Sequence, residues 1–450
     1  MKDWTSQRVA TAASASLRAP APEPHAGPER VVIDSRQAGP GTLFVGLPGE
    51  RVDGGAFGLA ALAAGAWGVL TTPEHAPDQL PDGAVWMTTP EPLAALQRLA
   101  TAWRRALQAQ VIGVTGSTGK TSTKELVKAL LAPHRRVVAS RANFNTEIGL
   151  PLELLAAPSG TEVLVLEMGM RGAGQIAELA QIAEPDVAVI VSIGPVHVEL
   201  LGGLPQIAAA KAELIAALAP GASAVIPAGE ALLAPHRRDD IDTVTFGPGG
   251  DITLRSSDGE RLEIDAAGET LVLQAPFAQA HLRRNLLAAV GAARAVGVTP
   301  SGRVEFEVGP GRGQHVALAP GITLIDDSYN ANPMSMRAAL QDLAASAAAG
   351  QRRVAVLGDM LELGPEARAF HAELGPQADA AGVEVLVTVG PLAAAIGERF
   401  GGELHVTADA EEATALLATL LAPGDVVLVK ASNGVGLGAL CHALHGMVAT

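Results

Sequence analysis

The feature that most constrains the fold is a strand-like run leading directly into a glycine-rich loop and a helix, VIGVTGSTGKTSTKELVKALL at residues 111–131. In such a loop, successive backbone N–H groups can wrap phosphate oxygens, and the following helix adds a favourable dipole at its N-terminus. Lys120 is expected to reach the β- and γ-phosphates, and Thr121 to place its hydroxyl on Mg²⁺. The usual pattern has glycine where this chain has Val114. The alternative is an ordinary glycine-rich turn, but the flanking strand and helix favour a nucleoside triphosphate site.

Strand-like and helical stretches alternate through the middle and the end of the chain. In the middle, β-branched runs separated by Ala/Leu-rich helices are typical of βαβ units with a parallel sheet. Between residues 251 and 274 the pattern alternates around two turns, which predicts antiparallel hairpins, followed by a helix over 281–295. The last third predicts an open doubly wound sheet. The predicted strands are residues 30–34, 42–45, 67–71 and 84–87 near the start, 111–114, 163–166, 187–192 and 224–227 in the middle, and 322–325, 353–357, 383–389 and 425–430 near the end.

The length of 450 residues suggests about three domains, at roughly 150 residues each. We place a small α/β domain at residues 1–89, a central P-loop domain with a parallel sheet at 90–312, and a C-terminal, doubly wound, Rossmann-like domain at 313–450. The glycine-rich segment VGPGRGQ marks the second boundary. The chain is therefore expected to be an α/β protein of three unequal domains.

Composition and charge exclude several classes of protein. Hydrophobic residues make up 48% of the chain and charged residues 18%, which is too apolar for intrinsic disorder. The net charge of −15 leaves no basic field for nucleic acid. The N-terminus lacks the apolar segment of a secretory signal, and glycines break the uncharged run at 54–73, which we interpret as a helix, a turn and a short strand. We expect a soluble, cytoplasmic protein without membrane insertion, and a monomer by default.

The single cysteine, Cys441, rules out an intrachain disulfide and fits a reducing compartment. It lies close in sequence to His442 and His445, near the C-terminus. We interpret all three as surface residues of a helix, with zinc binding as the less favoured alternative.

Polar residues follow several predicted strands at the point where each strand ends. Glu167 comes after four apolar residues, where an acid can hold the metal of a P-loop site, although a lone acid there can also be a solvated strand end. His197 follows the next strand in a Gly-Pro loop, and taken alone it favours a structural role. The string DDSYNANP at 326–333 is too polar for a core, and its Asn-Pro predicts a turn and a helix start. In a doubly wound sheet, this position binds ligands.

At this point the sequence resembles the ATP-dependent Mur ligases of peptidoglycan synthesis. Within that family, the YNANP string is similar to that of members that add D-alanyl-D-alanine, whereas sister ligases look like DYAHxP. The matching motifs span nearly the whole chain in family order: DSR (34–36), GTLFVGLPGERVDG (41–54), VTGSTGKTS (114–122), NFNTEIGLP (143–151), EMGMRGAGQI (167–176), IGPVHVE (193–199), AKAE (210–213), HLRRN (281–285), GPGR (309–312), DDSYNANPMSM (326–336) and LGDMLELG (357–364).

The resemblance implies an enzyme that joins D-alanyl-D-alanine to UDP-N-acetylmuramoyl-tripeptide through an acyl phosphate, with ATP and Mg²⁺. The implied catalytic residues are Lys120, Glu167, His197 and Lys211, the last matching a lysine that is carbamylated in related ligases. The implied metal-binding residues are Thr121, Glu167 and His197. The implied ATP-binding residues are Gly116, Ser117, Thr118, Gly119, Lys120, Thr121, Ser122, His281, Asn285, Arg312, Asp327, Tyr329 and Asn330. The implied substrate-binding residues are Ser35, Arg36, Leu47, Gly49, Asn143, Asn145, Thr146, Lys430 and Ser432.

The chain departs from the family pattern at a few positions. Thr146 stands where a second Asn or Asp is frequent, AGEA at 228–231 replaces an Asn-rich turn, and Asn433 stands where arginine is frequent. Without the family, Lys211 would be a helix-surface residue. Two alternatives stay open at this point: a sister ligase that adds a single amino acid or glutamate, and a P-loop ATPase or degenerate paralogue that binds without ligating.

Overall fold

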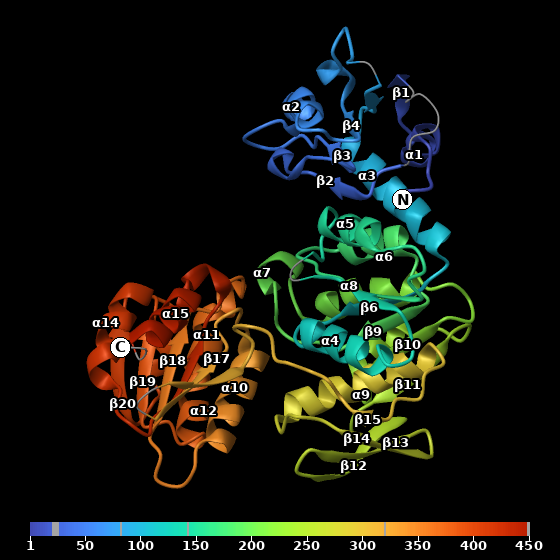
Figure 1. Cartoon of the computed structure of the whole chain (residues 1–450). Coiled ribbons are helices and arrows are strands. Elements are labelled where there is room, and N and C mark those ends of the chain that lie inside the picture. The colour runs from blue at the N-terminus through green and yellow to red at the C-terminus, as the bar shows by residue number, and fades with distance from the viewer. Residues whose placement is uncertain (20–26, 82, 142–143, 319–320, 448–450) are drawn as a thin grey trace.

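The computed structural model describes residues 1–450 except 20–26, 82, 142–143, 319–320 and 448–450, and it contains three sheets (Figure 1). The N-terminal sheet has the strand order β1-β5-β4-β3-β2, and it is parallel except that β1 runs antiparallel to β5. Its strands are β1 Ser16–Ala19, β2 Arg30–Val32, β3 Thr42–Val45, β4 Gly68–Thr71 and β5 Val85–Thr88, and its helices are α1 Ser6–Ala13 and α2 Gly58–Ala63.

The long helix α3, Pro92–Leu107, connects this sheet to the central part of the chain. Its apolar residues recur at helical spacing, and those that are buried include Leu96, Leu99 and Trp103. They belong to one hydrophobic cluster that holds residues of the N-terminal sheet, such as Leu43, and residues of the central part, such as Leu150. The first two parts of the chain therefore share a continuous core, and Figure 1 shows α3 between them.

The central sheet has ten strands in the order β15-β14-β13-β12-β11-β10-β9-β6-β8-β7. Neighbouring strands pair in parallel along β11-β10-β9-β6-β8-β7. The strands β12, β13 and β14 form the predicted antiparallel hairpins. The strands are β6 Gln110–Thr115, β7 Val137–Ala139, β8 Val163–Glu167, β9 Val187–Ile190, β10 Ser223–Pro227, β11 Asp242–Phe246, β12 Ile252–Asp258, β13 Arg261–Ala266, β14 Glu269–Gln274 and β15 Gly302–Arg303. The helices are α4 Lys120–Leu131, α5 Gly149–Ala156, α6 Gln175–Ala183, α7 Val198–Leu201, α8 Leu204–Ala216 and α9 Ala280–Ala295.

The C-terminal sheet is doubly wound, as predicted, with the order β16-β17-β21-β18-β19-β20. Only β16 is antiparallel to its neighbour among the paired strands of this sheet. The strands are β16 Gln314–Leu318, β17 Ile322–Asp326, β18 Arg353–Gly358, β19 Val385–Val389, β20 Glu403–Thr407 and β21 Val426–Lys430. The helices are α10 Pro333–Ser346, α11 Ala367–Ala372, α12 Leu374–Ala380, α13 Ala394–Gly397, α14 Ala410–Leu420 and α15 Leu437–Met447.

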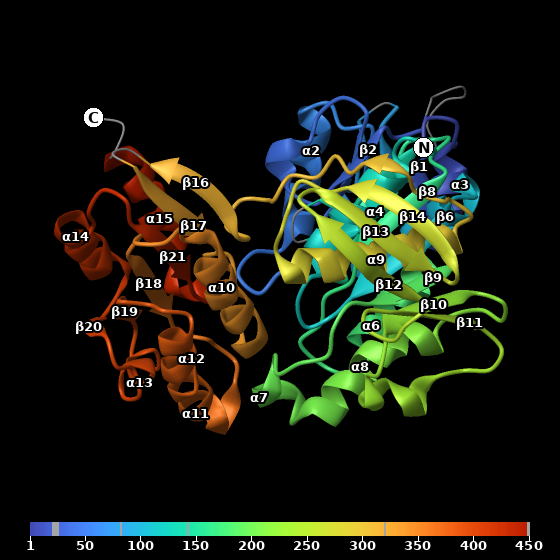
Figure 2. The ribbon, with the colours of Figure 1, turned by 90° about the horizontal axis from the view of Figure 1, so that it is seen from below.

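The C-terminal part has its own hydrophobic core on each face of its sheet, one under α10 and α12 and the other under α14 and α15. Figure 2 shows it as a separate body beside the central part. The domain boundaries at 89/90 and 312/313 stay predictions. Both fall between strands of different sheets, after β5 and before β16 respectively.

The structure corrects the sequence interpretation at one strand end and at Cys441. The strand predicted at 187–192 ends at Ile190, because Ser192 turns away to bond the glycine-rich loop. Cys441 is not a surface residue, since only 1% of it is exposed, although His442 and His445 are exposed. In α15, Leu437, Cys441 and Leu444 share one face at a helical spacing, and that face packs on the sheet.

Burial raises the pKa of the Cys441 thiol, which keeps it in the form that does not bind metals.

Over the described residues, no helix combines the length and the apolar character that a membrane span needs.

Candidate active site

The glycine-rich loop follows β6, which lies between β8 and β9 in the central sheet. Gly119 adopts a positive φ of 80°, and a Cβ there would lie 2.7 Å from Oδ1 of Asn285 and 2.9 Å from Cγ1 of Val191. Any larger residue would therefore clash with a neighbouring strand end and with α9. The structure brings Asn285, which the resemblance assigns to nucleotide binding, directly against the loop.

Hydrogen bonds tie the loop to the segment after β9. The backbone N–H groups of Ser117 and Thr118 donate to the carbonyl and the hydroxyl of Ser192, each at 2.9 Å. The Ser117 hydroxyl donates to the Gly194 carbonyl and accepts from the Gly194 N–H, again at 2.9 Å. Ser192 and Gly194 were not expected from the sequence. A serine and a Gly-Pro pair within four residues after a strand were the available signal.

Lys120, the first residue of α4, folds back over the loop, and its Nζ donates to the Gly116 carbonyl at 2.7 Å. Burial lowers the pKa of Lys120, the positive charge of Arg312 adds to this effect, and the negative charge of Glu167 opposes it. The ammonium is therefore held over the loop that would carry the phosphates, in an environment where an added negative charge would stabilise it.

Glu167 ends β8 and lies beside the start of α4. Its carboxylate accepts a hydrogen bond from the Thr121 hydroxyl at 2.7 Å and another from Nδ2 of Asn145 at 2.9 Å, while its own N–H donates to the Ser140 hydroxyl. Only 4% of Glu167 is exposed, so the alternative of a solvated strand end is wrong. A hydroxyl and a carboxylate at this spacing are the hard oxygen donors that Mg²⁺ prefers when phosphates and water complete its coordination.

The remaining residues of the predicted substrate loop behave differently from Asn145. Thr146 uses its hydroxyl locally, accepting from the Gly149 N–H at 3.3 Å at the start of α5. Asn143 lies outside the described residues.

His197 and Lys211 lie on the same side of the site. His197 has a positive φ of 52° and contacts the carboxylate of Glu362, a residue of the C-terminal part, through Nδ1. Burial lowers the pKa of His197, the charges of Lys120 and Lys211 add to the effect, and Glu362 opposes it. The contact with Glu362 was not expected from the sequence.

Lys211 is buried in α8, with 2% of it exposed, so the interpretation as a helix-surface residue is wrong. Its apolar neighbours at helical spacing, Ile207 and Ile215, were the sequence signal for burial. Within the part of the chain that the structure describes, its ammonium makes no hydrogen bond or ion pair. Burial and the charge of Lys120 hold the pKa of Lys211 well below its ordinary value.

The nucleotide-side residues of the C-terminal part gather after β17. The Arg312 guanidinium lies 3.8 Å above the Tyr329 ring, and the Tyr329 N–H donates to the Gly311 carbonyl at 2.9 Å. Lys430 donates to the Asp327 carboxylate at 2.6 Å and to the Asn330 carbonyl at 2.8 Å. Lys430, predicted to bind substrate, is thus already paired with residues predicted to bind ATP.

Charged groups of this cluster influence the pKa of His281 in the central part of the chain. Burial raises the pKa of Asp327, and the positive charge of Lys430 opposes the shift. Burial lowers the pKa of His281 on α9, with Asp342 and Asp327 opposing the shift and Lys430 adding to it. His281 and the cluster around Asp327 therefore face each other from the two parts. Ser432 is buried and accepts from the Leu361 N–H at 2.9 Å.

The predicted substrate residues of the N-terminal sheet lie near the ends of β2 and β3. Arg36 is paired with the Asp34 carboxylate at 2.7 Å, yet 87% of its side chain is exposed, so the guanidinium can reach a ligand. Ser35 begins the same short 3₁₀ helix. The Leu47 carbonyl accepts from the Gly54 N–H, and a Cβ on Gly49 would lie 2.8 Å from the Val52 carbonyl, which fixes the loop that follows β3.

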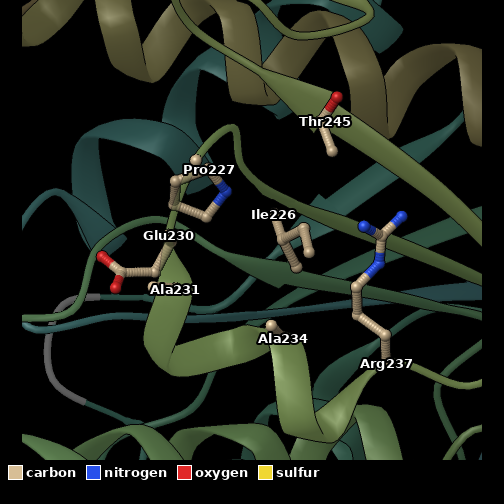
Figure 3. A pocket seen from close by; sticks show the side chains of 8 residues that line it. Ile226, Pro227, Glu230, Ala231, Ala234, Arg237 and Thr245 are labelled. Carbon is tan, nitrogen blue, oxygen red and sulfur yellow. The ribbon is translucent and has the colours of Figure 1, made fainter.

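A separate hollow of about 210 Å³ lies at the ends of β10 and β11 (Figure 3). Its lining includes Glu230, Arg237 and Thr245, and the AGEA turn contributes to its wall. It is smaller than the roughly 300–1,000 Å³ of most small-molecule pockets, and it includes none of the predicted nucleotide residues. The residues predicted to bind the nucleotide lie instead on the central part and the C-terminal part.

Comparison with known proteins agrees with this arrangement. Family models match residues 29–104 (Mur ligase family, catalytic domain), 114–293 (Mur ligase middle domain) and 311–433 (Mur ligase, glutamate ligase domain). The UDP-N-acetylmuramoyl-tripeptide–D-alanyl-D-alanine ligase of Synechocystis sp. is 38% identical over 92% of this chain and 91% of its own length. The enzyme of the same name from Bacillus subtilis is 36% identical over 90% of this chain and 91% of its own length.

Solved structures show the same similarity. MurF from Acinetobacter baumannii superposes with a TM-score of 0.88 and 28% identity, covering 98% of this chain and 99% of its own. MurF ligase from Thermotoga maritima, solved in complex with ADP, has a TM-score of 0.82 and 30% identity, covering 93% of this chain and 98% of its own. From its family matches, its relatives and its three-part fold, we conclude that the chain belongs to the Mur ligase family.

Proposed function

We propose that this chain is the ATP-dependent ligase that joins D-alanyl-D-alanine to UDP-N-acetylmuramoyl-tripeptide, giving UDP-N-acetylmuramoyl-pentapeptide, ADP and phosphate. The observation that carries the proposal is the cluster of Thr121, Asn145 and Glu167 beside a glycine-rich loop that already holds Lys120. The names of the relatives supply the substrates, and the ADP in the Thermotoga maritima structure supports the nucleotide. The reaction would belong to the synthesis of peptidoglycan precursors in the cytoplasm. The enzyme would act as a monomer.

The first half of the reaction follows from charge. A carboxylate is a poor electrophile, so ATP phosphorylates the terminal carboxylate of the tripeptide and converts it into an acyl phosphate. Two anions must approach each other, and the Lys120 ammonium lowers the repulsion between them. Thr121 and Glu167, with His197 nearby, would hold Mg²⁺, which supplies further charge neutralisation when bound. The amine of the dipeptide then attacks the acyl carbon, and phosphate leaves.

Lys211 is proposed to carry a carbamate. Because burial holds the pKa of Lys211 low, its neutral amine is available to add CO₂, forming an N–C bond and releasing one proton. The resulting anion would offset the positive charge of Lys120 next to it. Mass spectrometry of the intact protein in bicarbonate should show the added CO₂, and Lys211→Arg should not show it. A wild-type mass without the added CO₂ would contradict this part of the proposal.

The other residues divide between the substrates. The phosphates would be bound by Gly116, Ser117, Thr118, Gly119 and Ser122. Once the C-terminal part closes, the rest of the nucleotide would be bound by His281, Asn285, Arg312, Asp327, Tyr329 and Asn330. Ser35, Arg36, Leu47 and Gly49 would hold the uridine-diphosphate end. Asn143, Asn145 and Thr146 would lie along the peptide, with Lys430 and Ser432 on the side of the incoming dipeptide.

The test is phosphate release from ATP in the presence of UDP-N-acetylmuramoyl-tripeptide, measured with and without D-alanyl-D-alanine. Release that depends on both substrates is expected, together with a product heavier by the dipeptide. Release that does not depend on the dipeptide would contradict the proposal. A sister ligase would instead respond to a single amino acid or to glutamate, and a regulatory ATPase to neither.

Lys120→Ala should lower turnover by at least about a hundredfold, because it removes the positive charge that brings two anions together. Its circular dichroism spectrum and melting temperature should stay close to those of the wild type, since among the described residues the lysine bonds only its own loop. Lys128→Ala, on the exposed side of the same helix, is the matched control. Retained activity in Lys120→Ala would remove Lys120 from the phosphate site.

A further inference from the structure

Two residues with strained backbone meet where the C-terminal part touches the central part. His197 has a φ of 52° and Glu362 a φ of 61°, and neither is a glycine. A non-glycine residue in this region is uncommon and carries strain, which persists only where the surroundings hold it. The Glu362 carboxylate contacts Nδ1 of His197, and one of its oxygens lies 3.9 Å from Nε of Arg171.

The loop that carries Glu362 is fixed from inside the C-terminal part. Nε2 of His371 accepts from the Met360 N–H at 2.8 Å, and Nδ1 of the same ring donates to the Ala367 carbonyl at 2.6 Å. The Ser432 hydroxyl accepts from the Leu361 N–H at 2.9 Å. Met360 and His371 are fully buried. The backbone just before Glu362 is therefore held firmly, and its side chain extends toward the central part.

Glu362 differs from the other acids near this surface. Asp327 is paired with Lys430 at 2.6 Å, Asp326 accepts from Ser328 at 2.6 Å, and Asp359 accepts from the Ala393 N–H at 2.7 Å, all within the C-terminal part. Among the described residues, the partners of the Glu362 carboxylate lie in the central part. It can exchange them without breaking a bond of its own domain.

Through its contact with His197, Glu362 is connected to the segment that supports the glycine-rich loop. His197 follows the segment whose Ser192 and Gly194 bond the phosphate-binding loop. The positive charge of Lys120 reaches His197. This charge would repel an incoming ammonium group unless a carboxylate accompanied that group.

We propose that Glu362 binds the ammonium group of the incoming dipeptide, exchanging His197 and Arg171 for it. This inference rests on the proposed function and deepens it, because it names the residue that recognises the amine. A charged hydrogen bond suits an α-amino group, which is mostly protonated near neutral pH. Held by the C-terminal part, the ammonium group would be carried to the acyl phosphate when the two parts close. There it loses a proton to solvent, and its nitrogen then attacks the acyl carbon as the C–O bond to phosphate breaks.

The experiment compares Glu362→Gln with the wild type and with Glu366→Gln, a change of the same kind at an exposed position four residues away. Phosphate release gives the KM for each substrate. Positional isotope exchange in ¹⁸O-labelled ATP, with UDP-N-acetylmuramoyl-tripeptide alone, reports acyl phosphate formation without the dipeptide. N-acetyl-D-alanyl-D-alanine, which lacks the ammonium group, serves as a competitive inhibitor.

For Glu362→Gln, the KM for D-alanyl-D-alanine should rise about tenfold or more, as expected for the loss of a charged hydrogen bond. The KM for ATP and the isotope exchange should stay within about threefold, and the acetylated dipeptide should inhibit both proteins equally. Glu362→Asp should recover part of the affinity, and Glu366→Gln should match the wild type.

Three outcomes would overturn the inference: an unchanged KM for the dipeptide, a rise in the KM for ATP instead, or loss of the isotope exchange. The last two would mean that Glu362 acts through His197 on the nucleotide. Wild-type phosphate release that ignores the dipeptide would contradict the proposed function itself, so the two failures are distinguishable.

Discussion

The two junctions of the molecule differ in what holds them. At the first, between the N-terminal and central parts, Trp4 packs edge-on against Trp103 at 5.5 Å, and the Trp103 indole donates to the Ala157 carbonyl at 3.0 Å. These residues lie in a continuous hydrophobic core. At the second, between the central and C-terminal parts, Glu362 meets His197 and Arg171 through polar groups.

The different contacts at the two junctions indicate which junction can move. A shared apolar core must be exposed to water if its two halves separate, at about 25 cal/mol per Å². Polar contacts near the surface can exchange partners with water or with a ligand at little net change in free energy. We therefore expect the first two parts to behave as one body and the C-terminal part to close and open against it. This matches the division of the nucleotide residues between the central and C-terminal parts.

The largest effect on stability is expected for Trp103→Ala at the first junction. Removal of a buried indole should lower the free energy of unfolding by about 3–5 kcal/mol, and urea unfolding followed by circular dichroism measures it. Leu361→Ala at the second junction, where 42% of the side chain is exposed, is the matched control and should change stability by less than about 0.5 kcal/mol. Equal losses in the two variants would contradict the contrast.

A smaller effect is expected for Gly194→Ala at the second junction. A Cβ there would lie 1.8 Å from Sδ of Met334 on α10, an overlap that must displace the methionine or the whole C-terminal part. Overpacking of this kind costs about 1–3 kcal/mol when it cannot be relieved. We expect a change in small-angle X-ray scattering with little loss of stability, because this junction can shift. The double variant Gly194→Ala, Met334→Ala should restore the wild-type profile, and a Gly194→Ala profile that matches the wild type would argue against a movable joint.

The smallest effect is a pH dependence of the loop that carries Glu362. Burial lowers the pKa of His371 below its ordinary value, so the unfolded chain binds a proton more readily than the folded one. The stability that neutral His371 supplies is therefore complete above the unfolded pKa of about 6.5 and falls as the pH drops below it, by at most about 1.4 kcal/mol per pH unit.

The measurement is the urea midpoint of the C-terminal transition between pH 7.5 and pH 5.5. His371→Gln, whose side chain does not titrate, should flatten the curve in this range. If the wild type and His371→Gln lose stability equally on acidification, another group is responsible.

Much of the fold followed from local patterns. The start of α10 is an example, because Asn332 caps it with its side chain and Pro333 occupies its first turn, as the Asn-Pro pair predicted. The glycine-rich loop, Lys120 and Thr121 followed for the same reason, since a strand, a tight loop and a helix start are all set by neighbours in sequence. Spacing along one helix was sufficient in principle to predict that Lys211 and Cys441 are buried, although Cys441 was wrongly placed at the surface.

The amino-acid sequence alone was sufficient to predict the alternation of strands and helices, the glycine-rich loop after β6 and the motifs of the family. The tertiary structure decided what those residues meet: that Glu167 lies under Thr121 and Asn145, that Ser192 supports the loop, and that Glu362 faces His197 across a junction 165 residues apart in the chain. The physical reason is that local propensity depends on near neighbours, whereas a contact between distant residues depends on how sheets pack and which of their faces are buried.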